Sequence, residues 1–267
     1  MSLPSRKELL FLAKELDKII PDLIKEATGN ALLNYDDVHQ DLYDRWYASL
    51  DLSKKITDQS PDWSIYADPG YLTMTVFCFS NWSKRNALAT IKFFNDLDIC
   101  PKSIVDVFGG NGQSTVLLAK AFPTSEVIYF NTDAEQPAIV TLLKERFKAE
   151  NLTITNQLSG AECVCAFDAM EHLVEPCNFI HPILTAPETK FYIDSSSFAS
   201  PEIGHFPEYV DFEGNIWKND VFKRRYSKFL KSIGYLRCDN KDRFFAKQPF
   251  NGRPTIYVHK TFSKSIK

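Results

Sequence analysis

The chain has 267 residues, of which 44% are apolar and 24% are charged, and its formal net charge at pH 7 is −3. These values are typical of a folded globular protein, so they exclude extensive disorder, and the small net charge excludes a whole-chain field that attracts nucleic acid. The six cysteines include no Cys-x-x-Cys pair, so the sequence predicts no metal site. Because the sequence has no signal-peptide core and no run of 18 apolar residues, we expect a cytoplasmic protein without a membrane span.

The first 100 residues are predicted to form a helical region of their own. Leucine and isoleucine recur at helical spacing over Leu9–Ile20, Pro21 is expected to interrupt or restart that helix, and Gly29 is expected to end it. The other predicted elements of this region are helices at 35–50 and 81–97 and a turn-rich segment at 58–70. We expect residues 1–100 to dock on the rest of the chain, to cap its site and to offer a surface for a homodimer.

Residues 101–267 alternate between strand-like and helix-like segments, which predicts an α/β domain built on a mainly parallel sheet. The predicted strands are 103–107, 126–131, 152–158, 162–167, 190–194, 235–238 and 255–259. The predicted helices are 114–121, 137–150 and 220–233, and the predicted loop is 195–219. The last two strands follow a glycine that closes the last helix, so we expect them to form a hairpin-like pair.

A glycine turn joins the first strand of this domain to its first helix. The sequence Phe-Gly-Gly-Asn-Gly at 108–112 directly follows the apolar strand, and strand, glycine turn and helix form the opening unit of nucleotide-binding α/β sheets. Gln113 occupies the lysine position of a P-loop, and Thr115 occupies the third glycine position of a dinucleotide-binding fingerprint. The pattern therefore disfavours these two kinds of site. The remaining interpretations are a different nucleotide site and an ordinary glycine turn without a ligand.

The stretch Val105–Gly112 resembles the first motif of the class I S-adenosylmethionine-dependent methyltransferases, in which an apolar–acidic–apolar strand end precedes Gly-x-Gly-x-Gly. It departs from that motif at Phe108, which occupies the first glycine position. The resemblance covers about residues 100 to 260 and implies S-adenosylmethionine as the cofactor and a seven-stranded, mostly parallel Rossmann-like sheet. The cofactor-binding residues that it implies in this motif are Asp106, Phe108, Gly109, Gly110, Asn111 and Gly112.

The resemblance also implies contacts to the ribose and the adenine of the cofactor. In that family an acidic residue about nineteen positions after the last motif glycine binds the ribose; here the count reaches Asn131, and Asp133 follows two residues later. An amide offers one acceptor oxygen where a carboxylate offers two, so the choice between Asn131 and Asp133 is open. Gln157 is the candidate for the adenine, with a plain solvated turn as the alternative.

Residues 167–176, FDAMEHLVEP, resemble the segment after the fourth strand of many small-molecule methyltransferases. The resemblance implies that Asp168 and Met170 lie at the cofactor and that Glu171 and His172 face the methyl acceptor. His172 and His205 are the predicted bases for a hydroxyl or protonated amine acceptor, because imidazole titrates near neutral pH. The alternatives are a histidine that only packs at a helix start and a surface-loop histidine without a role.

These motifs predict a methyltransferase that acts on a small molecule at oxygen or nitrogen. The dipeptide Pro176-Cys177 resembles the nucleophile motif of cytosine-C5 methyltransferases, but it comes about ten residues too late after the fourth strand, so a nucleic acid substrate is disfavoured.

Two other hypotheses stay open. A non-catalytic module that retains the fold agrees with the departures at Phe108 and Asn131, and a nucleotide-dependent oxidoreductase is disfavoured by the missing third glycine.

Overall fold

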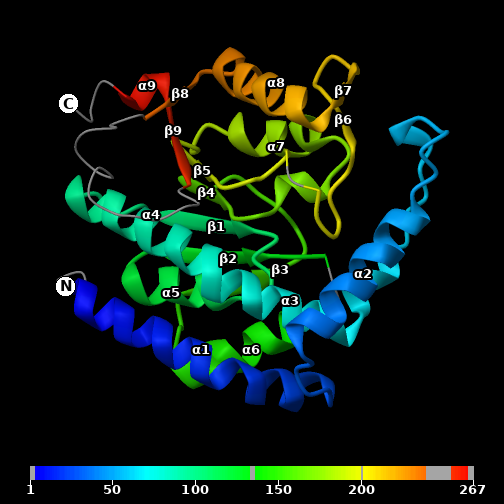
Figure 1. The fold of residues 1–267 in the computed structure, drawn as a ribbon. Helices are drawn as coiled ribbons and strands as arrows, with labels where there is room; N and C mark the ends of the chain where they lie inside the picture. The colour runs from blue at the N-terminus through cyan, green and yellow to red at the C-terminus, as the bar shows by residue number, and fades with distance from the viewer. Residues whose placement is uncertain (1–3, 133–135, 200, 239–253, 264–267) are drawn as a thin grey trace.

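The sheet of this protein has the predicted architecture. The computed structural model describes residues 4–132, 136–199, 201–238 and 254–263, and within these ranges seven strands form one sheet in the order β3-β2-β1-β4-β5-β9-β8 (Figure 1). Its strands are β1 (Ser103–Val107), β2 (Glu126–Phe130), β3 (Leu152–Thr155), β4 (Cys163–Ala166), β5 (Phe191–Asp194), β8 (Tyr235–Arg237) and β9 (Thr255–His259). β9 runs antiparallel to β5 and β8, whereas the other pairs are parallel. The predicted mainly parallel sheet with a terminal hairpin is confirmed.

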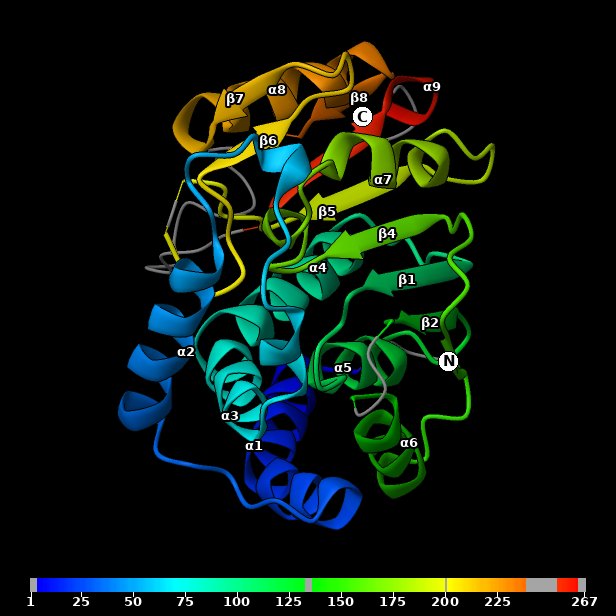
Figure 2. The same cartoon turned by 90° about the vertical axis from the view of Figure 1, so that its right-hand side faces the viewer.

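Helices cover both faces of this sheet (Figure 2). They are α1 (Arg6–Thr28), α2 (Tyr35–Ser49), α3 (Pro69–Cys78), α4 (Lys84–Asp96), α5 (Gln113–Ala121), α6 (Gln136–Phe147), α7 (Pro176–Leu184), α8 (Asn219–Ser232) and α9 (Lys260–Ser263). Strand side chains alternate between two cores: Cys163 and Cys165 pack with α1, α4, α5 and α6, whereas Val164 and Ala166 pack with α7 and α8. The apolar strands are therefore buried on both sides, as parallel strands are.

The first helix differs from the prediction at Pro21. α1 continues through this proline and ends at Gly29, whose φ is 75° and whose N–H donates to the carbonyl of Lys25. A proline inside a helix removes one backbone hydrogen bond. The helix continues because Leu23 and Ile24, beyond the proline, are buried in the same core as the residues before it. The predicted break is wrong, and the predicted end at Gly29 is confirmed.

The third helical segment begins more than ten residues before its predicted start at 81. Asp68 caps α3 by accepting the N–H of Gly70 at 2.8 Å, and Pro69 occupies the first helical turn, where its fixed φ is favourable. The prediction of turns as far as residue 70 is wrong at this end, because Asp-Pro-Gly starts a helix here. A π-helical segment, Phe79–Ser83, joins α3 to α4 without a break, and such segments are frequent at functional sites.

The long predicted loop 195–219 contains structure that the sequence pattern did not reveal. β6 (Glu208–Val210) and β7 (Ile216–Lys218) form a hairpin within it. Tyr209 is fully buried, and its hydroxyl donates to the carbonyl of Glu171 at 3.0 Å. This loop is therefore packed on the segment that follows β4. The short 3₁₀ helices are Ile56–Asp58, Trp63–Ala67 and Met170–His172.

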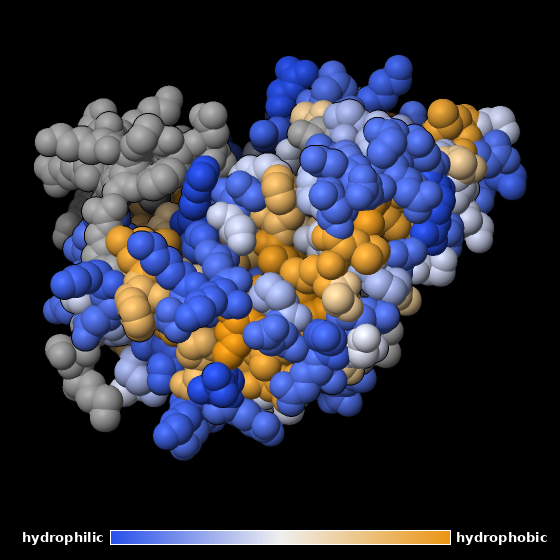
Figure 3. All heavy atoms as spheres, turned by 60° about the horizontal axis from the view of Figure 1, so that its bottom comes forward, coloured by the Kyte–Doolittle hydropathy of each residue, from blue (hydrophilic) through white to orange (hydrophobic). Residues whose placement is uncertain are grey.

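Some apolar side chains of the N-terminal region remain at the surface. Figure 3 turns the lower side of Figure 1 forward and shows apolar residues among charged ones on that face. Leu10 and Phe11 of α1 and Leu33, which follows α1, are exposed. A homodimer through the N-terminal helices stays a prediction. Among the helices that the structure describes, none combines the length and the apolar character needed to cross a membrane.

Candidate functional site

A cavity of about 650 Å³ lies at the carboxyl ends of β1, β4 and β5. The first strand pairs with β2 on one side and β4 on the other, so the strand order reverses here. Ligands of open α/β sheets bind at such a point. The other wall of the cavity comes from α3, the π-helical segment and α4, so the N-terminal region contributes to the site.

The glycine turn bounds this cavity, and its glycines have different physical roles. A Cβ on Gly112, whose φ is 78°, would lie 2.5 Å from the Val140 side chain. A Cβ on Gly109 would lie 2.8 Å from Asp106 Oδ2. Gly110 has a φ of 55°, lines the cavity, and its Cβ would meet no atom within 4 Å. Packing therefore accounts for two of these glycines, whereas Gly110 leaves open space at the cavity.

Phe108 occupies the first glycine position of the motif in a left-handed conformation, with φ 54°. This conformation costs a residue with a side chain about 1–2 kcal/mol. Its ring stacks on Phe179 of α7 at a centroid distance of 5.3 Å and meets Phe130 at the end of β2 edge-on. The departure from the motif therefore comes with an aromatic cluster at one edge of the cavity.

Asp106, the acidic residue of the motif, is fully buried at the end of β1. Its Oδ2 accepts the hydroxyl of Thr115 at 2.6 Å, while its Oδ1 has no hydrogen-bond partner. Burial raises the pKa of Asp106 to about 7. Asn86 of α4 also lines the cavity with a buried, unpartnered Oδ1. Asn86 Oδ1 is an acceptor, and so is Asp106 Oδ1 when the carboxyl group is ionised, so a ligand that satisfies both has to supply donors or positive charge.

Asn131 and Gln157, which are predicted to contact the ribose and the adenine, lie outside the described cavity lining. Asn131 is buried after β2 and donates to Gln136 Oε1 at 2.8 Å. It also donates at 3.0 Å to the hydroxyl of Tyr129, which itself donates to the carbonyl of Gly110, so this amide braces the glycine turn. Gln157 is exposed after β3, and Asp133 lies outside the described residues. These contacts stay predictions.

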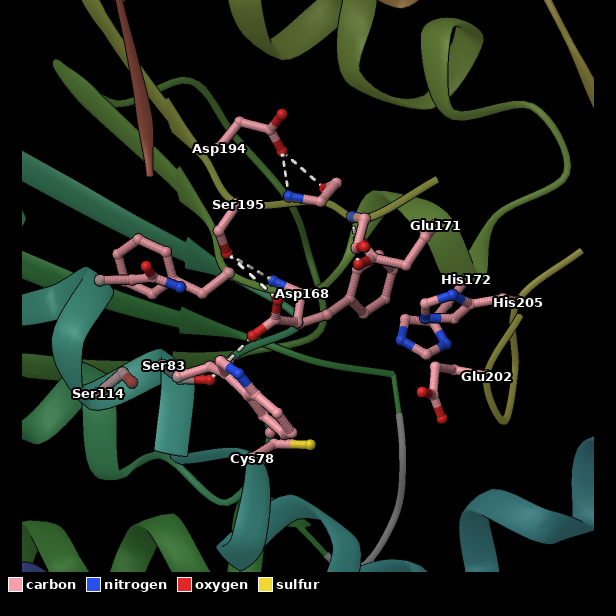
Figure 4. A pocket seen from close by; sticks show the side chains of 18 of the residues that line it. Cys78, Ser83, Ser114, Asp168, Glu171, His172, Asp194, Ser195, Glu202 and His205 are labelled. Carbon is pink, nitrogen blue, oxygen red and sulfur yellow. Dashed lines mark hydrogen bonds between the residues drawn. The ribbon is translucent and has the colours of Figure 1, made fainter. Parts of the chain in front are cut away.

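Three carboxyl groups converge at the ends of β4 and β5 (Figure 4). Asp168 accepts the Ser83 hydroxyl from the α4 side at 3.2 Å, and burial, followed by the charge of Glu171, raises its pKa to about 7. Asp194 accepts the Ser196 hydroxyl at 2.6 Å, and burial raises its pKa to about 6. Glu171 is 1% exposed, and its Oε1 accepts the Ser197 N–H at 2.7 Å, whereas its Oε2 has no partner.

Among the other residues predicted for this segment, Met170 is fully buried outside the cavity lining. The two predicted bases do come together. The rings of His172 and His205 are 5.0 Å apart, and His172 Nδ1 lies 3.0 Å from the hydroxyl of Tyr66 (Figure 4). Burial and the neighbouring His205 lower the pKa of His172 to about 4, so its imidazole is neutral at pH 7. These histidines lie on separate segments of the chain, so only the family resemblance could predict from the sequence that both are at the same site.

Sequence reasoning missed Ser83, Asn86 and Asp194. Ser83 and Asn86 reach the cavity through the π-helical segment and α4, and no sequence pattern identifies such a π segment. Asp194 did give a signal, because it is the only charged residue of β5 and stands at the carboxyl end of that strand. Among the described residues, no group of three or more histidine, cysteine or acidic side chains has the arrangement of a metal site.

Trp46 of α2 ties the N-terminal region to the loop that carries His205. Its ring is fully buried, and its Nε1 donates to the carbonyl of His205 at 2.8 Å. We expect Trp46→Phe to lower the free energy of unfolding by about 1–3 kcal/mol, because it removes a buried hydrogen bond to the carbonyl of His205. Denaturant unfolding measures this change. Exposed Trp63→Phe is the control, and an equal loss in both variants would contradict the role of the Trp46 hydrogen bond.

The sequence matches no protein-family model, and a search of curated proteins gave no match. Comparison with solved structures does find similar folds. An O-methyltransferase family protein from Burkholderia thailandensis is 9% identical, with a TM-score of 0.53 over 84% of this chain and 69% of that protein. Residues 101–267 make up a smaller share of this chain than the 84% that is covered, so the similarity extends into the N-terminal helices.

Two further solved structures have lower TM-scores. A candidate O-methyltransferase from Nostoc punctiforme is 12% identical, with a TM-score of 0.48 over 91% of this chain and 71% of that one. The N-terminal domain of EvdMO1, determined with SAH and D-fucose, is 10% identical, with a TM-score of 0.45 over 66% of this chain and 82% of that one. The strand order and the Burkholderia similarity together show that this chain has the class I methyltransferase fold.

Proposed function

We propose that this protein is an S-adenosylmethionine-dependent methyltransferase that acts on a small molecule. The observation that carries the proposal is the pairing of Gly110 and Asp106 at one end of the cavity. Gly110 leaves open space there, and Asp106 Oδ1 is a buried acceptor without a partner. A methyltransferase fold supports many functions, so this local geometry supports the proposal more than the fold does.

The residues present fit the cofactor by their chemistry. S-adenosylmethionine carries an ammonium group and a sulfonium, which are the kinds of charge that a buried acceptor pair favours. Asp106 Oδ1 and Asn86 Oδ1 are acceptors without partners, and Gly110 allows a ligand to approach the backbone closely. We infer that these three residues hold the methionine part of the cofactor. The first helical N–H groups of α5, which follow the glycine turn, add positive potential for its carboxylate.

The cofactor supplies an electrophilic methyl group for an in-line displacement. The chain itself has to hold the acceptor in line with that methyl group and to exclude water. Asp168, Glu171 and His172 line the cavity beside the ends of β4 and β5, next to the β1 turn. A base near pH 7 works best with a pKa near 7. The pKa of Asp168, about 7, meets this condition better than that of His172, about 4.

Calorimetric titration with SAH, with S-adenosylmethionine and with NAD tests the proposed function. We expect binding of the first two in the micromolar range, about −8 kcal/mol, and no heat with NAD. Binding of NAD alone would favour an oxidoreductase. If neither S-adenosylmethionine nor SAH gave heat at millimolar concentration, the protein would be a non-catalytic module, which the Phe108 side chain at the first glycine position would then explain.

A further inference from the structure

A buried carboxylate oxygen at the acceptor end of the cavity lacks a partner. Glu171 is 1% exposed and lines the cavity, yet its Oε2 makes no hydrogen bond. A buried carboxylate oxygen that stays unsatisfied is costly. Three buried side-chain atoms of the described cavity lining, on Asn86, Asp106 and Glu171, lack a partner, and all three are oxygens. The cavity therefore favours a ligand that brings donors.

The titratable groups nearest to this atom are also carboxyl groups. Asp168 and Asp194 lie close enough to Glu171 for its charge to act on both. The lysine and arginine of the described lining, Lys223 and Arg237, are exposed on α8 and β8. The buried charged groups of the lining are thus acidic, whereas its exposed ones, Glu202, Lys223 and Arg237, carry both signs. Burial and the charge of Glu171 raise the pKa values of Asp168 and Asp194, and a cation bound beside them would favour their ionised forms.

We propose that the methyl acceptor is a small-molecule amine, which binds as an ammonium ion with its N–H groups donated to Glu171 and to the neighbouring carboxyl groups. This inference rests on the proposed function and names its substrate class. An alcohol or phenol has one donor and no charge, so it could pair with Glu171 Oε2 but would not compensate the charge of the carboxyl groups. Aromatic side chains, among them Phe167 and Phe198, belong to the same lining, and aromatic rings attract cations.

The acceptor group and the cofactor group occupy different ends of the cavity. Asp106 ends β1, whereas Asp194 ends β5, and β4 lies between these two strands. Neighbouring strands lie about 4.8 Å apart, so the two ends are separated by about 10 Å. Glu171 follows β4 and belongs with Asp194 and Ser197 on the β5 side. One cationic ligand group at each end therefore satisfies both sets of acceptors.

For a primary amine, methyl transfer begins with the loss of a proton. The bound ammonium first gives one proton to a carboxylate, for which Asp168 is best suited, and this frees the nitrogen lone pair. That lone pair forms the new N–C bond while the S–C bond breaks and its electron pair returns to sulfur. The nitrogen then carries one methyl group, two protons and a positive charge, and the product leaves as a methylammonium ion.

Matched pairs of amines and alcohols test this inference. The protein saturated with SAH is titrated with two pairs of compounds: benzylamine and benzyl alcohol, and 2-phenylethylamine and 2-phenylethanol. In separate reactions with S-adenosylmethionine, mass spectrometry identifies the methylated products. We expect each amine to bind at least about 10-fold more tightly than its alcohol, and we expect N-methylated products only.

Glu171→Gln keeps the shape of the side chain and removes its charge, so it is expected to reduce the preference for amines at least about 10-fold. Glu175→Gln is the matched control, because Glu175 is exposed on the same segment and lies outside the cavity lining. Thermal unfolding of both variants shows whether each is folded.

The inference is overturned if the alcohols bind as tightly as the amines, if no amine binds, or if a folded Glu171→Gln protein keeps the full preference. The two proposals fail separately. Absence of SAH binding contradicts the proposed function, whereas SAH binding without a preference for amines contradicts only the amine acceptor.

Discussion

Replacing Gly110 with leucine is expected to reduce the affinity for SAH by at least about 100-fold, close to 3 kcal/mol. A Cβ at this position meets no protein atom within 4 Å and the residue lines the cavity, so a leucine side chain would occupy the space assigned to the cofactor. The φ of 55° adds a folding cost of about 1–2 kcal/mol for a residue with a side chain. Calorimetry gives the affinity and denaturant unfolding gives the stability.

Gly214 provides a control with the same backbone strain. It has a φ of 84° in the β6–β7 turn, and its Cβ also meets no atom within 4 Å, but it lies outside the cavity lining. Gly214→Leu should therefore lose similar stability and keep its affinity for SAH. Unchanged affinity in Gly110→Leu, or an equal loss of affinity in both variants, would place the cofactor elsewhere.

Periodicity was sufficient to predict the sheet. The central strands of the main sheet are short and apolar, and their side chains fill cores on both faces, so local pattern and tertiary burial agree. Errors arose where tertiary packing decides the local structure. α1 passes Pro21 because the residues beyond it are buried, and the β6–β7 hairpin is short and held by the buried Tyr209.

The candidate site was only partly predictable. The glycine turn and Glu171 could be identified because each follows a strand whose carboxyl end faces the ligand edge of the sheet. Asn86 and Ser83 could not, because their approach depends on how the N-terminal helices dock on that edge. The chemistry of the acceptor end depends on whether each carboxylate oxygen has a partner. Such partners come from segments far apart in the sequence, as the Glu171–Ser197 hydrogen bond illustrates.

Asp106→Asn is expected to change how stability depends on pH. Burial raises the pKa of Asp106 from 3.8 to about 7 in the folded protein. Between these values the unfolded chain releases the Asp106 proton while the folded protein keeps it. This group therefore makes the wild-type protein less stable as pH rises from about 4 to about 7, and its effect is constant above pH 7. Asparagine cannot ionise and lacks this contribution.

The expected result is that the variant gains about 3 kcal/mol relative to wild type between pH 5 and pH 8. The difference in stability between the two proteins reports the titration of Asp106. Asp168, Asp194 and His172 titrate in both proteins, and Asp106 is not among the causes of their pKa shifts. Denaturant unfolding at several pH values measures it. Parallel stability curves for the two proteins would mean that Asp106 is already ionised at pH 5 and stays a buried carboxylate without a ligand.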